Sequence, residues 1–231
     1  MMLDRLDPEL RPVATASIAV GIVIGAFGAV FGVTAVAAGG SVLQACVMSA
    51  LVFTGASQFS AVSVVATGGS TAAALSSSLL LAARNGVYGL TMARVLDGSL
   101  ARRLGAAHLV IDETTAMATA QTQRRQQAAA FWVTGLTLFV CWNLGTLGGA
   151  LLGSEIDPKR WGLDAAVPAG FVAMVWPQFK TRNGRLAGLL GALVCLATIP
   201  FVPVGMSILC AAVAVLVGIR PEPAPESGGA A

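Results

Sequence analysis

Charged residues are absent from three long stretches of the chain. No Asp, Glu, Lys or Arg occurs in residues 12–83, 126–154 or 186–219, and apolar side chains fill most of each stretch. An α-helix needs roughly 20 apolar residues to cross a bilayer. Because the stretches are apolar throughout instead of alternating with polar residues, they predict membrane helices and not the strands of a barrel.

The same pattern separates one membrane domain from two polar ends. We expect a cytoplasmic lead over residues 1–15, a transmembrane domain over residues 16–219 and a disordered tail over residues 220–231, which is rich in proline and glycine. Residues 16–38 and 128–152 predict uninterrupted spans, whereas polar residues or prolines divide the other apolar runs. The predicted fold class is therefore all-α, a polytopic helical membrane protein of six or seven membrane segments with broken or re-entrant helices.

Glycines recur along one face of each uninterrupted span. Small residues at this spacing let the backbone of another helix approach closely, so we expect the first span to pack against protein on one face. The glycines are Gly21, Gly25, Gly28 and Gly32 on the first span, and Gly145, Gly149 and Gly153 on the second.

The run over residues 42–67 is long enough to cross but is interrupted near its middle. Small and polar residues there favour a local break, which predicts two half-helices. A break frees backbone amides and carbonyls at membrane depth that can bind the charged ends of a ligand, although close helix packing by small residues is the alternative. The candidate site residues at this break are Gly55, Ala56, Ser57, Gln58 and Phe59.

Basic residues orient the membrane segments, because basic loops prefer the cytoplasm. If residues 42–67 and 71–96 both crossed the bilayer, the arginines that follow would lie outside. A re-entrant pair of half-helices at the first break would restore the expected orientation. The segments predicted to lie inside are residues 1–15, 94–125, 178–186 and 220–231.

Arg84 lies near the middle of the apolar run over residues 71–96, where it is followed by Asn85 and a glycine that predict a second break. An arginine at this depth costs roughly 2.5–3.5 kcal/mol on insertion scales. The functional interpretation is that its guanidinium meets a carboxylate, either of a bound solute or of Asp112 or Glu113. The alternative is a tilted helix from which the side chain reaches the cytoplasmic face.

Asp112 and Glu113 are adjacent, so on a helix their side chains point roughly 100° apart and cannot both face one partner. One of them could bind an ammonium group or carry a proton, with its pKa raised by burial. The alternative is an acidic surface pair beside Arg102 or Arg124.

Composition excludes several classes of function. The net charge is +3, and the basic residues are spread along the sequence instead of forming one patch. The sequence therefore gives no indication of nucleic-acid binding. Four isolated cysteines and a single histidine, His108, argue against a metal site or a disulfide framework. Neither a phosphate-binding loop nor a nucleophile motif occurs, so we expect no enzymatic activity and no cofactor.

Four motifs in order along the chain resemble the AzlC family. They are FTGASQF at residues 53–59, RNGVYG at 84–89, DETTAMA at 112–118 and GLDAAVP at 162–168, followed by WPQ at 176–178. The resemblance covers about residues 12–218. One departure is that family members often read Asn-x-Arg-His where this chain has Ala82-Ala83-Arg84-Asn85, which removes a histidine at position 85.

The resemblance implies the large subunit of a secondary transporter that exports leucine, isoleucine, valine and possibly methionine. It further implies the bacterial inner membrane, the proton-motive force as the energy source and a small hydrophobic AzlD-type subunit as the partner. The alternatives are import or export of another small amphipathic solute, and a membrane scaffold that transports nothing.

The candidate residues suit such a substrate. Its carboxylate would meet Arg84 or a half-helix N-terminus, and its ammonium would meet Asp112 or Glu113. Phe59 and Trp176 could line an aliphatic pocket, although Trp176 beside a basic loop equally suits the membrane interface. Gln178 completes a second Gln-Phe pair beside a helix breaker, which hints at an internal repeat.

Overall fold

The computed structural model describes residues 10–155, 172, 176–202, 206–214 and 216. All regular structure in this part of the chain is helical, which agrees with the predicted all-α class. The segments predicted over residues 1–9, 156–171 and 220–231 lie outside the described residues. The elements are α1 (Arg11–Ala37), α2 (Val42–Leu51), α3 (Ala56–Ala66), α4 (Thr71–Met92), α5 (Leu100–His108), α6 (Asp112–Thr119), α7 (Arg124–Gly153), η4 (Trp176–Lys180), α9 (Arg182–Thr198), α10 (Met206–Ala211) and η5 (Ala212–Ala214).

Two helices of the described chain, α1 and α7, are long and apolar enough to cross a membrane. The total of six or seven membrane segments stays a prediction. Residues 11–15 were expected to belong to the polar lead, but α1 already begins at Arg11. Pro12 allows this early start because a proline in the first turn lacks only an amide hydrogen that has no partner inside the helix.

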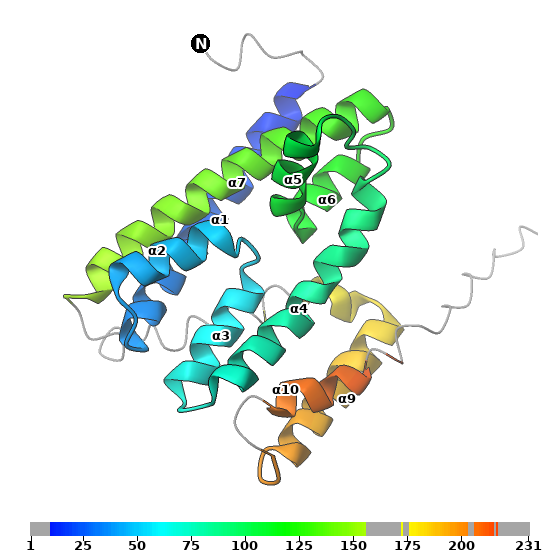
Figure 1. Ribbon diagram of the computed structural model, residues 1–231. Helices are drawn as coiled ribbons and strands as arrows, with labels where there is room; N and C mark the ends of the chain where they lie inside the picture. Colours follow the sequence, from blue (N-terminus) through cyan, green and yellow to red (C-terminus); the bar gives the residue numbers. More distant parts are fainter. Residues whose placement is uncertain (1–9, 156–171, 173–175, 203–205, 215, 217–231) are drawn as a thin grey trace, which may run out of the picture.

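α1 and α7 lie side by side and run parallel, with their N-termini at the same end (Figure 1). Near that end, the hydroxyls of Ser17 and Thr134 share a hydrogen bond of 2.9 Å. Toward the other end the two backbones touch: a Cβ added at Gly145 would overlap the carbonyl of Gly25, and one at Gly149 would overlap that of Ala29. The predicted packing of the glycine faces is therefore confirmed, and the two faces pack on each other.

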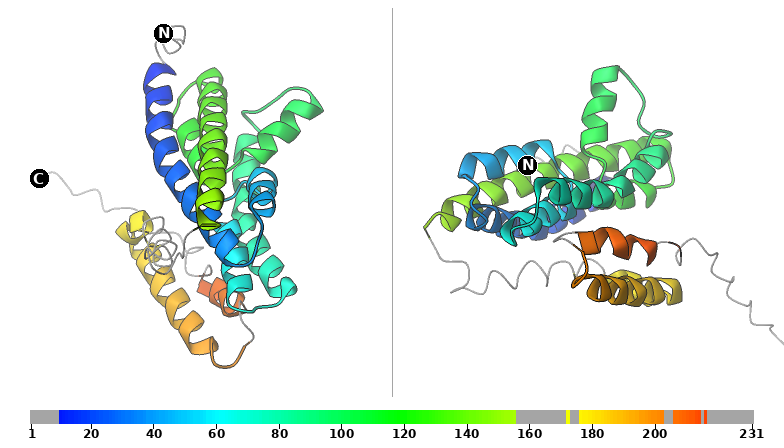
Figure 2. Two further views of the ribbon diagram at one scale, coloured as in Figure 1. Left: turned by 90° about the vertical axis from the view of Figure 1, so that its left-hand side faces the viewer. Right: turned by 60° about the horizontal axis from the view of Figure 1, so that its bottom comes forward.

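The run over residues 42–67 is broken, as predicted, into α2 and α3. α2 runs back along α7, the chain turns at residues 52–55, and α3 returns toward the end at which α2 begins (Figures 1 and 2). The turn requires Gly55, whose φ of +57° with a ψ of −84° is a conformation that side chains with a Cβ strongly disfavour. α2 and α3 together form a hairpin that does not cross the molecule.

Gln58 holds this hairpin together. Its side chain is fully buried; Oε1 accepts a hydrogen bond from the backbone N–H of Gly55 at 3.2 Å, and Nε2 donates to the carbonyl of Met48 at 3.0 Å. One amide thus satisfies backbone groups on both sides of the break. Without it these groups would be buried and unpaired, at a cost of about 1–3 kcal/mol each.

The second predicted break, at Arg84, is wrong. α4 continues from Thr71 to Met92 without interruption. Glycine within a helix costs only about 1 kcal/mol, and the charge of Arg84 is compensated by a carboxylate instead of by unwound backbone. α4 packs against α3 through serines: Ser60 donates to Ser77 Oγ at 3.0 Å, and Ser78 donates to the carbonyl of Ser57 at 2.9 Å.

Residues 94–125 were expected to form a cytoplasmic segment, but part of this stretch enters the core. α5 descends into the molecule, the chain turns at residues 109–111, and α6 returns (Figure 1). Leu109 and Ile111 at the turn are buried. The buried Thr114 fixes this turn, because its hydroxyl oxygen accepts from the backbone N–H of Ile111 at 3.0 Å and its O–H lies 2.8 Å from the carbonyl of Leu109. The distribution of charged residues does not predict that a short apolar turn between two polar helices is buried.

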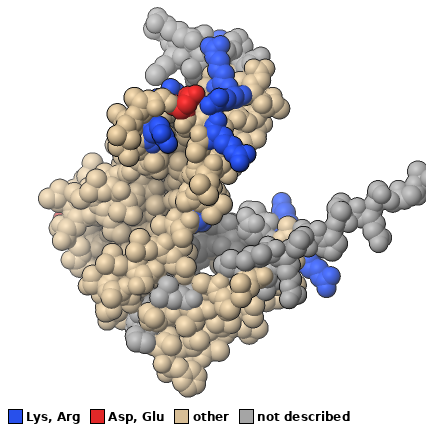
Figure 3. Space-filling view, turned by 45° about the vertical axis from the view of Figure 1, so that its right-hand side comes forward, with Lys and Arg blue, Asp and Glu red and all other residues tan. Residues whose placement is uncertain are grey.

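Basic side chains gather at the end of the molecule where α1 and α7 begin (Figure 3). They include Arg102 and Arg103 on α5 and Arg124 and Arg125 at the start of α7. Arg124 pairs with Asp97 at 3.1 Å, with both side chains largely exposed. Because basic segments prefer the cytoplasm, we expect this end to face the cytoplasmic side.

The last apolar stretch is divided into two helices, α9 and α10, that pack on each other. α9 ends at Thr198, and α10 packs back on it and also contacts α4 (Figure 2). Pro200 lies in the turn that follows α9, where a residue without an amide hydrogen cannot extend the helix.

Gly149→Ala should destabilise the protein, because the added methyl overlaps the carbonyl of Ala29. Overpacking of this kind typically costs about 1–3 kcal/mol, which corresponds to a fall in Tm of about 2–10 °C for a chain of this size. The matched control is Gly148→Ala on the same helix, where nothing lies within 4 Å of the added Cβ. There alanine should leave Tm unchanged or raise it. Equal Tm values for the two variants in detergent would contradict backbone contact between α1 and α7.

Gln58→Leu should loosen the α2–α3 hairpin, because leucine fills the space but pairs with neither Gly55 nor Met48. We expect a loss of about 2 kcal/mol or more and faster hydrogen exchange at the amides of residues 55–58. Gln121→Leu is the control, since the Gln121 side chain makes one hydrogen bond of 3.5 Å, to Met117. Unchanged exchange in Gln58→Leu would refute the role of this amide.

Candidate functional site

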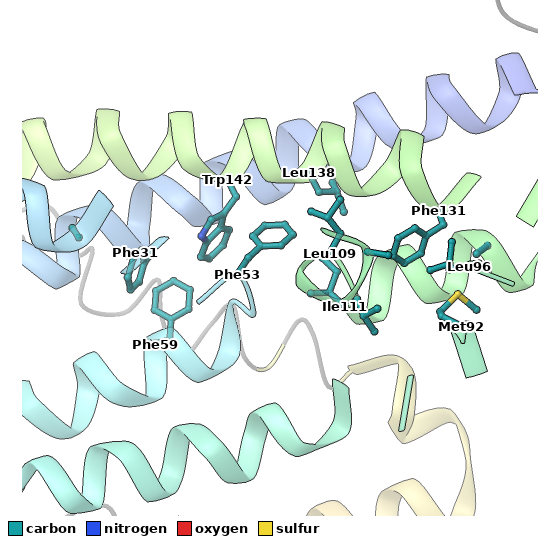
Figure 4. Close-up of a cluster of buried hydrophobic side chains, with 14 of the residues drawn as sticks. Phe31, Phe53, Phe59, Met92, Leu96, Leu109, Ile111, Phe131, Leu138 and Trp142 are labelled. Atoms are coloured by element: carbon teal, nitrogen blue, oxygen red, sulfur yellow. The ribbon is translucent and has the colours of Figure 1, made fainter. Parts of the chain in front are cut away.

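The turns of the two hairpins meet inside the molecule. The ring of Phe53, from the α2–α3 turn, lies 6.3 Å from the ring of His108 at the end of α5, and both contact Phe139 of α7, at 5.3 and 5.6 Å. Figure 4 shows Phe53 beside Leu109 and Ile111 of the α5–α6 turn. The α2–α3 hairpin and the α5–α6 hairpin enter the molecule from different directions. Their turns therefore share one buried core.

A second set of rings closes the core on the side away from the basic end. Phe31 of α1 stacks on Trp142 of α7 at 5.8 Å, and Phe59 of α3 meets both edge-on, at 5.6 and 6.1 Å. Figure 4 shows the three side chains pointing toward one another. Phe59 is thus part of a packed aromatic cluster, and Phe31 is fully buried within it.

Arg84 and Asp112 form an ion pair beside the hairpin turns. Arg84 Nη1 donates to Asp112 Oδ2 at 2.8 Å. α4 supplies the arginine from its second half, and Asp112 is the first residue of α6. Each side chain is 35% exposed, so the pair is only partly covered by the rest of the chain. The hypothesis that Arg84 meets a carboxylate of the 112–113 pair is supported by this contact, and the partner is Asp112.

Glu113 does not share that contact. It is partly buried on α6, a helix of eight residues that is too short to span a bilayer. Burial raises the pKa of the Glu113 carboxyl above its ordinary value, and the negative charge of Asp112 raises the pKa further, whereas a backbone hydrogen bond and Arg84 lower it. The two acidic residues therefore differ: Asp112 is paired with an arginine, whereas Glu113 is held with a raised pKa.

Several buried polar atoms near these groups have no hydrogen-bond partner in the described part of the chain. They include Thr54 Oγ1 at the α2–α3 turn, Asn85 Oδ1 next to Arg84, and Thr115 Oγ1 on α6. Unpaired buried oxygens are rare in folded proteins. Of these three, Thr115 Oγ1 lies on the same side of α6 as Asp112, because Thr115 follows Asp112 by three residues.

The remaining predicted residues at the first break serve the fold. Ala56, Ser57 and Gln58 are buried; the carbonyl of Ser57 accepts from Ser78, and Gly55 forms the turn. Their geometry explains the hairpin, whereas their role in substrate binding stays a prediction.

The structure does not bring Trp176 into this core. Its side chain is 65% exposed and packs on Phe179 at 6.4 Å within η4. The buried cluster that contains Phe59 does not include it. Gln178 lies in the same short element, but its side chain lies outside the described residues.

Thr114, Thr54 and Thr115 escaped the analysis of the sequence as site or turn residues. All three are small and hydroxylated, so a search for charges passes over them. The available signal was their position, because each lies within two residues of Gly55 or of the acidic pair, inside motifs already noted.

The arrangement suits a zwitterion better than a metal ion. In the described residues, no group of three or more His, Cys, Asp or Glu side chains could hold a metal. A guanidinium, a carboxylate and neutral oxygens instead match a solute that carries one carboxylate and one ammonium.

Comparisons with known proteins agree with a membrane role. The chain is 29% identical over 188 residues to an uncharacterized membrane protein of Helicobacter pylori, which covers 79% of this chain and 82% of the relative. It is 28% identical over 209 residues to inner membrane protein YgaZ of Escherichia coli, which covers 85% of each. No solved structure matches the chain.

The family model described as AzlC protein matches residues 19–156. This range is more than half of the 231 residues and contains both hairpins, Arg84 and Asp112. The family is associated with transport, and its relatives are named as membrane proteins. The chain is therefore a membrane protein that belongs to the AzlC family.

Proposed function

We propose that this chain is the large subunit of a secondary exporter of branched-chain amino acids in the bacterial inner membrane. Leucine, isoleucine, valine and possibly methionine are its substrates, the proton-motive force drives it, and a small AzlD-type membrane subunit completes it. The observation that carries the proposal is the half-exposed ion pair of Arg84 and Asp112 beside two helix breaks. Family membership supports the same class of activity.

An amino acid can replace each half of this ion pair. Its carboxylate takes the place of Asp112 on the guanidinium of Arg84, and its ammonium takes the place of Arg84 on the carboxylate of Asp112. The one charge-assisted contact within the protein is then exchanged for two between the protein and the substrate. Neither protein charge is left unpaired at membrane depth, where an unpaired charge is strongly unfavourable.

The ammonium group has three N–H donors, as a lysine side chain does. Asp112 supplies one acceptor, and the unpartnered oxygens of Asn85 and Thr115 are candidates for the others. A neutral solute or a simple carboxylic acid leaves these acceptors unsatisfied. The site therefore favours an amino acid over either.

Glu113 is the proposed proton carrier. Its raised pKa lets it take up a proton at a higher pH than an exposed glutamate does. Since it follows Asp112 directly, its charge state changes the field at the substrate site. Proton binding and substrate binding are thereby linked.

Arg84→Ala should abolish leucine and valine flux in proteoliposomes that contain the chain with its small partner and an imposed pH gradient. Arg84→Lys should retain less than about a tenth of the flux, because a single ammonium cannot form the bidentate contact of a guanidinium. Full flux in the lysine variant would contradict bidentate binding of the carboxylate. A silent wild-type protein in an intact complex would instead favour the scaffold interpretation.

Exchanging the two charges separates a structural role from a binding role. Arg84→Asp combined with Asp112→Arg preserves the ion pair, so the Tm of the double variant should return toward the wild-type value relative to either single change. Flux should stay absent, because the substrate charges now face the wrong groups. Restored transport would mean that the pair only supports the fold.

Glu113→Gln should separate proton coupling from substrate binding. With no group that can take up a proton at this position, we expect accumulation driven by the pH gradient to fall at least tenfold, while exchange of labelled for unlabelled leucine continues. Asp97→Asn, at the exposed pair with Arg124, is the control and should leave both assays unchanged. Loss of exchange in Glu113→Gln would contradict the assignment.

A further inference from the structure

A cavity of about 330 Å³ lies between the end of α4 and α5. Its volume falls within the range of small-molecule sites, roughly 300–1,000 Å³. The deep wall is apolar and buried, formed by Met92, Leu96, Ala106 and Val110. Arg103 is the charged residue that lines it, and this side chain is exposed.

The cavity leads toward the Arg84–Asp112 pair. Gly89, which lines it on α4, follows Arg84 by five residues, about 7.5 Å along the helix axis. Val110, which lines it on the other side, precedes Asp112 by two residues. One wall thus comes from α4, which carries Arg84, and the other from α5 and the turn that precedes Asp112.

The two ends of the buried core differ. The cavity lies beside Met92 and Leu96, near the basic end that we expect to face the cytoplasm, whereas the rings of Phe31, Phe59 and Trp142 are packed together at the other end of the cluster (Figure 4). Access from one side with closure on the other is the geometry of an inward-facing transporter.

We propose that this cavity is the cytoplasmic vestibule of the transport site, where Arg103 receives the carboxylate of the amino acid and the apolar wall receives its aliphatic side chain. The inference rests on the proposed function. A cation beside an apolar wall matches the carboxylate and the side chain of an aliphatic amino acid. Arg103 is thus a binding residue distinct from Arg84.

Arg103→Gln should raise the KM for leucine about tenfold when the substrate is added to the cytoplasmic face, measured as uptake by inside-out vesicles. The maximal rate should stay within twofold of the wild type, because Arg84 and Asp112 are intact. The matched control is Arg102→Gln: Arg102 has the same charge and is adjacent, but its guanidinium lies over the ring of Trp132 at 5.9 Å. Its KM should change less than twofold.

A labelling assay tests occupancy independently. Ala107→Cys places a thiol in the cavity lining, in a variant whose four natural cysteines are replaced by serine. A membrane-impermeant maleimide should label it from the cytoplasmic face, and leucine should slow the reaction at least fivefold in the wild-type Arg103 background but not with Arg103→Gln.

The outcomes separate the two proposals. A wild-type complex that moves no branched-chain amino acid overturns the proposed function and the vestibule together. An active wild type whose KM is unaffected by Arg103→Gln overturns the vestibule alone. Protection of the thiol by anionic phospholipid but not by leucine would also overturn it, since the cavity would then be a lipid site.

Discussion

The contact between the backbones of α1 and α7 sets the geometry of everything else described here. Lipid supplies no hydrophobic force that drives two apolar helices together, so they associate through close packing, which glycines permit. Gly145 and Gly149 lie against backbone atoms of α1, and the contacts from Ser17–Thr134 onward follow the same order along both helices, which therefore run parallel. Between two parallel helices the chain must return from one end of the pair to the other. α4 runs in the returning direction, and the hairpins α2–α3 and α5–α6 each turn back on themselves (Figure 1).

The hairpins are possible because polar side chains complete their backbone hydrogen bonds. Irregular backbone at membrane depth is tolerated where other protein groups complete its hydrogen bonds. Gln58 does so at one turn and Thr114 at the other, and both are fully buried. Aromatic rings then cover the turns, with Phe53 of one turn and His108 before the other both packed on Phe139. Short polar anchors within an aromatic core thus hold the ends of α3 and α6 next to Arg84 and Asp112.

Helix positions and the first break followed from the sequence because they depend on local properties: charge-free length, glycine spacing and the low cost of a turn at Gly55. The break expected at Arg84 did not form, because a carboxylate 28 residues away compensates the charge, and helix hydrogen bonds can then continue. The α5–α6 turn was hidden for the opposite reason. Its apolar residues 109–111 are too few to register as a membrane segment, and only the folded chain shows that they join the core. The cavity could not be predicted from the sequence either. Most of its lining residues are apolar like their neighbours, and only the packing of α4 against α5 brings them together around one space.

Ion pairing at Arg84 also limits how tightly a substrate can bind. An empty site is neutral because Arg84 and Asp112 satisfy each other, so a zwitterion gains little from charge alone: it replaces one pair with two similar contacts. The net preference for a particular amino acid must then come from its side chain, at about 0.8 kcal/mol for each buried methylene. Such a site binds aliphatic amino acids with modest affinity and discriminates among them by size. Modest affinity favours release, since a substrate held by uncompensated charges would stay bound at membrane depth.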